Sequence, residues 1–138
     1  MQVGTCEVDI PPPVGTPLCG SLSPRPSVGV EDPLYAKAIV LESEGTCIAY
    51  VLLDIAVLGR EVGDEAVRLA SERTGIPPDH VVWATSHTHT GPYTMFEEDM
   101  GGGVIDHEWL DALPEKFAEA VAGAHDAMQP ARAVRSRG

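Results

Sequence analysis

The chain has 138 residues, enough for one domain that buries about two thirds of the surface its unfolded form exposes. A net charge of −12, with Lys37 and Lys116 as the only lysines, leaves no basic stripe and makes nucleic acid and anionic membrane surfaces poor partners. Three cysteines without a C-x-x-C pair argue against a disulfide framework, and no apolar run reaches the length of a membrane span. No basic leader with an apolar core opens the chain, so we expect a cytoplasmic protein without an integral membrane segment.

The first predicted element is a half-buried strand from Val3 to Ile10, in which apolar and acidic residues alternate. Three prolines (residues 11–13) end it. The following segment, Val14 to Pro33, is rich in Gly, Pro and Ser and has no apolar period, so it predicts a long loop of the kind that is often functional.

A β-hairpin is predicted next. Two β-like runs, Leu34 to Glu42 and Thr46 to Asp54, are joined by three residues that include Gly45. The run from Ile48 to Leu53 is almost continuously apolar, which is typical of a central strand covered on both faces of its sheet.

A helix and a further strand follow. Apolar residues recur at helical spacing between Arg60 and Thr74, with Gly75 placed as a C-cap, and Val81 to Ala84 reads as a buried strand. A strand–helix–strand order favours a right-handed crossover and a partly parallel sheet. The fold class expected is therefore α/β, a mixed sheet containing a hairpin and a crossover, with helices packed on the sheet.

A second helix is predicted near the end of the chain. Apolar residues recur from Leu110 to Met128, and Pro114 suits the first turn of that helix, which places Asp111 just ahead of its start. Pro130 would end the helix. Ala131 to Val134 resembles the opening of another strand, so we expect an incomplete domain.

The segment Ser86-His87-Thr88-His89-Thr90-Gly91-Pro92 directly follows the strand that ends at Ala84. Residues i and i+2 of a strand point the same way, so His87 and His89 are expected to face one pocket. Imidazole is the commonest metal ligand, and the neighbouring hydroxyls could orient the rings. The alternative is that both histidines are merely exposed or hydrogen-bonded at a strand end.

A catalytic zinc site needs three protein ligands and an open water position, and two histidines do not meet that count. Asp54 is the best third candidate, although it equally suits a turn cap. Weaker candidates are Glu97, Glu98, Asp99 and His107, whereas His80 and His125 are most simply surface residues.

Several stretches, taken in order and spacing, resemble the N-terminal region of the neutral/alkaline (non-lysosomal) ceramidases over nearly the whole chain. They are Asp9-Ile10-Pro11-Pro12, Val14-Gly15-Thr16-Pro17-Leu18, Gly29-Val30-Glu31-Asp32-Pro33-Leu34-Tyr35-Ala36, Leu53-Asp54 and Thr85-Ser86-His87-Thr88-His89-Thr90-Gly91-Pro92.

The resemblance implies a zinc amidase that cleaves the amide bond between a fatty acid and sphingosine. It implies that His87 is a zinc ligand and that His89 contacts the substrate and takes part in catalysis. Gly20 is a further candidate for letting the backbone approach the substrate, although a plain turn glycine is the interpretation that we favour.

Members of that family are several times longer and supply the other zinc ligands, a His, a Glu and a Tyr, later in the chain. We therefore expect residues 1–138 to be the N-terminal portion of a catalytic domain, inactive alone, whose complete form uses Zn²⁺ and takes a small-molecule amide or lipid substrate. The chain also departs from the family after His89, where the acidic run Glu97-Glu98-Asp99 replaces a small, Gly-rich continuation.

Two other function classes stay open. One is a non-catalytic or weakly metal-binding module. The other is a different metal-dependent hydrolase, such as a barrel amidohydrolase that opens with H-x-H on its first strand. The hairpin and helix that precede His87 disfavour this last class.

Overall fold

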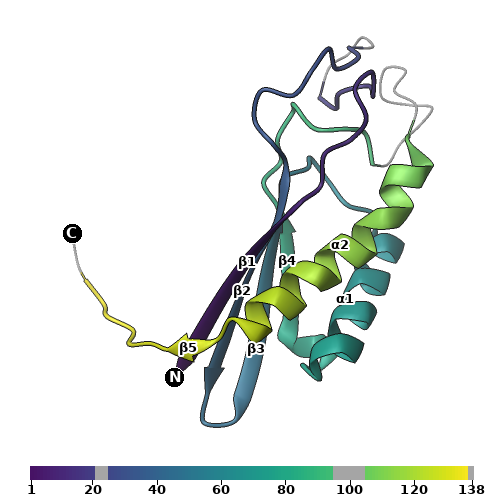
Figure 1. The fold of residues 1–138 in the computed structure, drawn as a ribbon. Helices are drawn as coiled ribbons and strands as arrows, with labels where there is room; N and C mark the ends of the chain where they lie inside the picture. The colour runs from purple at the N-terminus through teal and green to yellow at the C-terminus, as the bar shows by residue number, and fades with distance from the viewer. Residues whose placement is uncertain (21–24, 95–104, 137–138) are drawn as a thin grey trace.

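The computed structural model describes residues 1–20, 25–94 and 105–136. One five-stranded mixed sheet carries two long helices, and both helices lie on the same face of it (Figure 1). The elements in chain order are β1 (Gln2–Asp9), β2 (Tyr35–Ser43), β3 (Thr46–Leu53), α1 (Arg60–Thr74), the short 3₁₀ helix η1 (Pro78–His80), β4 (Val81–Thr85), α2 (His107–Asp126) and β5 (Gln129–Pro130).

The predicted α/β class, hairpin and crossover are confirmed. The strand order is β4-β3-β2-β1-β5, with β3 and β4 parallel and the other neighbours antiparallel. Glu44 and Gly45 form the hairpin turn with φ of 53° and 78°, because a tight turn that matches the strand twist needs two positive φ values. Gly75 ends α1 in the left-handed region, as expected of a C-cap.

The sheet and α2 approach one another closely where β1 crosses the helix. Gly4 is buried, and a Cβ built on it would lie 1.9 Å from the backbone oxygen of Ala124. On the helix side, a Cβ on Gly123 would lie 2.6 Å from Cys6 Sγ. Gly4 therefore permits a backbone-to-backbone contact with α2, and Gly123 makes room on α2 for the Cys6 side chain.

Two predictions about the last third of the chain are wrong. α2 begins at His107, not after Asp111, because the Asp106 side chain accepts a hydrogen bond from Trp109 N and caps an earlier start. Pro114 therefore lies inside the helix, which continues past it because its apolar face is buried on both sides of the proline. The last strand is Gln129–Pro130, and residues 131–134 form no strand.

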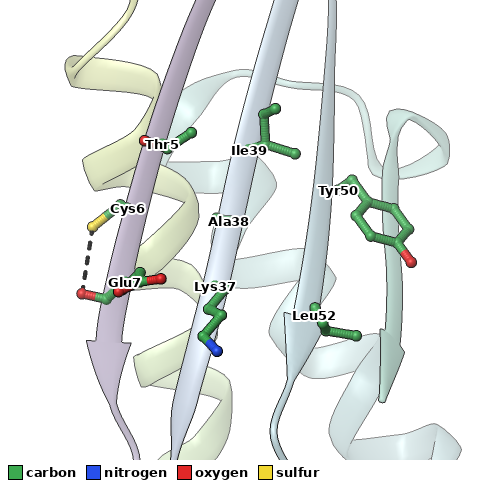
Figure 2. A pocket seen from close by; sticks show the side chains of 8 residues that line it. All are labelled: Thr5, Cys6, Glu7, Lys37, Ala38, Ile39, Tyr50 and Leu52. Atoms are coloured by element: carbon green, nitrogen blue, oxygen red, sulfur yellow. Dashed lines mark hydrogen bonds between the residues drawn. The ribbon is translucent and has the colours of Figure 1, made fainter. Parts of the chain in front are cut away.

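The sheet is covered on one face only among the described residues. Along β2 and β3 the alternate residues that face the helices are buried, whereas Ile48 and Tyr50 on the opposite face are each 45% exposed. Figure 2 looks onto this opposite face, where Ile39, Tyr50 and Leu52 line a depression of about 610 Å³. The expectation that β3 is covered on both faces is not met within the part of the chain that the structure describes.

The Gly4 contact leads to a stability prediction. Gly4→Ala forces α2 away from β1 and should lower the free energy of unfolding by about 1–3 kcal/mol, as overpacking does. Gly29→Ala is the matched control, because nothing lies within 4 Å of a Cβ there. Urea unfolding followed by circular dichroism measures both, and equal midpoints for the two variants would contradict the contact.

Candidate functional site

The histidine segment does not lie on a strand. β4 ends at Thr85, and His87 adopts a left-handed conformation with φ of 57°, which is rare for a residue with a side chain. The prediction that a strand points the His87 and His89 side chains in the same direction is therefore wrong, because neither residue lies on a strand. The two rings nevertheless meet in an edge-to-face arrangement, with centroids 5.1 Å apart.

Backbone carbonyls of the last residue of β3 and of the residues just after it hold the histidine segment in place. Ser86 N donates to Leu53 O at 2.9 Å, and His87 N donates to Ile55 O at 3.0 Å. Side chains add to these bonds: Thr85 Oγ1 donates to Ala56 O at 3.0 Å, and Thr94 Oγ1 donates to Val57 O at 2.5 Å. We call residues 53–57 the carbonyl cradle. It rests on the core, since Ile55 and Ala56 are almost fully buried.

The cradle also decides how His87 presents its ring. His87 Nδ1 lies 2.8 Å from Ala56 O, and a carbonyl oxygen can only accept a hydrogen bond, so Nδ1 carries the proton. In the neutral ring Nε2 then holds the lone pair. A backbone carbonyl behind one ring nitrogen is the arrangement that fixes a metal-binding histidine, so His87 fits the role of a single zinc ligand.

His89 is positioned by two parts of the loop between β1 and β2. A Cβ on Gly20 would lie 2.2 Å from His89 Nδ1, so the ring packs directly on the glycine backbone. Arg25 Nη2 donates to the carbonyl oxygen of His89 at 2.9 Å. Gly20, whose φ is 82°, therefore makes room for the His89 ring, which is a role that the sequence does not suggest.

The hydroxyls expected to orient the imidazoles bind elsewhere. Thr88 and Thr90 pair with each other, with Oγ1 atoms 2.9 Å apart. Both line a groove of about 630 Å³ between the histidine segment and residues 25–34. The threonines around the histidines suggested that hydroxyls orient the rings. The atom that orients the His87 ring is instead the backbone oxygen of Ala56.

Asp54, the expected third ligand, is committed to other partners. Its Oδ2 lies 3.1 Å from Lys37 Nζ and accepts a hydrogen bond from Tyr35 N at 3.2 Å. The hydrogen bond to Asp54 raises the pKa of Lys37 above its usual range. Asp54 thus ties the end of β3 to the start of β2, and these contacts are not those of a cap on the turn that follows it.

The remaining histidines do not join the site. His80 directly precedes β4, and its Nδ1 lies 3.0 Å from Cys47 O on β3, so it is a half-buried structural residue. His125 lies in the last turn of α2. His107 begins α2, and the candidates Glu97, Glu98 and Asp99 fall outside the described residues. Within residues 1–20, 25–94 and 105–136, no group of three or more His, Cys, Asp or Glu residues could hold a metal ion.

The proteins described below, to which this chain is similar in sequence or in fold, are ceramidases. No protein-family model matches the chain. Neutral ceramidase A of Dictyostelium discoideum is 29% identical over 147 residues, a match that covers 99% of this chain and 20% of that protein. The chain thus spans about a fifth of that relative's length.

Two solved structures share the fold. The crystal structure of neutral ceramidase from Pseudomonas aeruginosa superposes with a TM-score of 0.79 at 23% identity, over 94% of this chain and 22% of that chain. A ceramidase described as complexed with C2 superposes with a TM-score of 0.76 at 22% identity, again over 94% of this chain and 22% of the other. No helix in the described part of this chain is long and apolar enough to cross a membrane.

The contact between Gly20 and His89 can be tested by substitution. Gly20→Ala should displace the His89 ring and abolish the nuclear Overhauser contacts between the two imidazoles. Gly15→Ala is the matched control, because Gly15 also has a positive φ, of 98°, but nothing lies within 4 Å of its Cβ. Both variants should lose about 1 kcal/mol from backbone strain. An unchanged ring contact in Gly20→Ala would show that the ring is not seated on Gly20.

Proposed function

We propose that this chain, which belongs to the neutral ceramidase family, forms the N-terminal portion of a zinc-dependent amidase site. In that site His87 contributes one zinc ligand, and His89 faces the amide substrate. The observation that carries the proposal is the fixed His87 ring. Its Nδ1–H is bound to Ala56 O, and its Nε2 remains as an acceptor beside a second imidazole.

The chemistry follows from these two rings. When bound, zinc supplies Lewis acidity that activates water near neutral pH and polarises a carbonyl. His87 holds its acceptor nitrogen ready without a change of tautomer, because the cradle has already selected the protonated nitrogen. In the proposed site, His89, seated on Gly20, would donate a hydrogen bond to the developing oxyanion or move a proton to the leaving amine.

The proposed substrate is an N-acylated amino alcohol such as ceramide, or a related amide. The groove beside Thr88 and Thr90 supports this proposal, since apolar residues such as Val30 and Leu34 line it together with polar and charged residues such as Arg25 and Asp32, which suits a ligand with both apolar and polar parts. Residues 1–138 supply one ligand, so the proposal assigns the other zinc ligands to polypeptide outside the described residues and expects the chain alone to be inactive.

Zinc titration tests the ligand assignment. The 138-residue chain should bind Zn²⁺ more weakly than about 1 µM, because a single histidine cannot supply the affinity of a full ligand set. His87→Ala should abolish this binding in isothermal calorimetry. His125→Ala is the control, since His125 lies at the opposite end of α2 from the loops, and it should change nothing (Figure 1). Tight binding of one equivalent that survives in His87→Ala would overturn the assignment.

Activity tests the role of His89. Residues 1–138 can replace the corresponding fifth of Dictyostelium neutral ceramidase A, and the release of fatty acid from a short-chain ceramide can then be followed. His89→Ala should lower kcat by about 10²–10⁴-fold while the zinc content stays unchanged, as expected for loss of a general acid–base. His87→Ala should lose zinc and activity together. A His89→Ala fusion with full activity would remove His89 from the mechanism.

A further inference from the structure

The face of the sheet turned away from the helices is largely apolar. We call it the open face. Its side chains alternate with the buried ones, so they lie in register across β2, β3 and β4. Its apolar members on these three strands include Ile39, Leu41, Ile48, Tyr50, Leu52, Val82 and Ala84.

Exposure of this face is unusual for a soluble protein. Ile48 and Tyr50 are 45% exposed and Val82 is 52% exposed, and Tyr50 stands between Ile39 and Val82 on the neighbouring strands. Contiguous apolar patches on monomers are normally small, and larger ones mark interfaces. A strand that is apolar on both sides is typical of a sheet with layers on both faces.

The open face carries one ion pair beside its apolar area. Lys37 Nζ on β2 is 3.1 Å from Asp54 Oδ2. Glu7 on β1 lies opposite Lys37 (Figure 2). A covering layer would therefore bury the Lys37 ammonium together with its carboxylate partner, which avoids the high cost of an unpaired buried cation.

We infer that the open face is an interface inside a longer protein, covered by an apolar layer of polypeptide from outside residues 1–138. The length of the relatives supports this occupant: the same fold occupies 22% of the chain of the Pseudomonas ceramidase, so most of that chain is available to cover it. A second copy is disfavoured, because each copy carries a net charge of −12. The inference rests on the family relation that underlies the proposed function and not on its zinc chemistry.

A pair of lysines on the open face should have opposite effects in the short and the long protein. In the 138-residue chain, Ile48→Lys with Tyr50→Lys should suppress open-ended association, and should raise the concentration at which it begins by about tenfold. Val134→Lys is the matched control, because Val134 is 73% exposed on the tail beyond β5 and should leave association unchanged. Sedimentation velocity over a range of concentrations measures this.

In the fusion to the remaining four fifths of Dictyostelium neutral ceramidase A, the same two lysines should instead abolish soluble, folded protein, since they would be buried without partners. Tyr50 should be nitrated by tetranitromethane in the short chain and protected in the fusion. Tyr93, which is 5% exposed, serves as the protected reference in both.

Several outcomes would overturn the inference. A wild-type short chain that stays monomeric and is unaffected by the lysines would show that the face needs no cover. A dimer that saturates with Tyr50 protected would assign the face to a second copy. Binding to phosphatidylcholine vesicles that the lysines abolish would assign it to a lipid surface. The short-chain measurements decide these points even where the fusion does not fold, and they are independent of whether His87 binds zinc.

Discussion

The site depends on the carbonyl cradle, the short run of backbone that follows β3. Its carbonyls accept hydrogen bonds from the backbone of Ser86 and His87, from the ring of His87, and from the hydroxyls of two threonines. Because Ile55 and Ala56 are buried in the core, the position of the His87 ring is tied to the packing of the sheet against the helices. The left-handed φ at His87 persists because these bonds over-determine it, which is the usual condition for strain at a functional site.

The loop between β1 and β2 completes the site from the other side. Cys19 N donates to Gly91 O at 2.8 Å, Arg25 donates to His89 O at 2.9 Å, and Gly20 receives the His89 ring. Residues 64 to 72 positions apart are thereby brought against each other at one end of the sheet, beyond the C-terminal ends of β3 and β4, where open α/β sheets bind ligands. His87 is therefore held by the cradle and His89 by the loop, so the two rings meet only when both are in place.

Much of the fold was predictable from the sequence because it follows from local chemistry. The hairpin turn at Gly45, the cap at Gly75 and the helical period of residues 60–74 each depend on a few neighbouring residues, and all three are confirmed. The start of α2 was not predictable from Pro114, because the Asp106 cap and the packed apolar face together outweigh the loss of one hydrogen bond. The covering of the sheet on one face only was also not predictable. An apolar strand sequence shows that both of its faces can be buried, but it does not show which polypeptide buries them.

The sequence by itself determined the α/β class, the pair of histidines and the family resemblance, because these reside in local periodicity and in the order of short motifs. Only the tertiary structure decided how the two histidines are held. It showed that Ala56 O, a backbone atom with no sequence signature, selects the tautomer of His87. It also showed that Gly20 accommodates His89, and that Asp54 binds Lys37. Contacts between distant segments set these roles, and the free energy of such contacts depends on packing that no local pattern encodes.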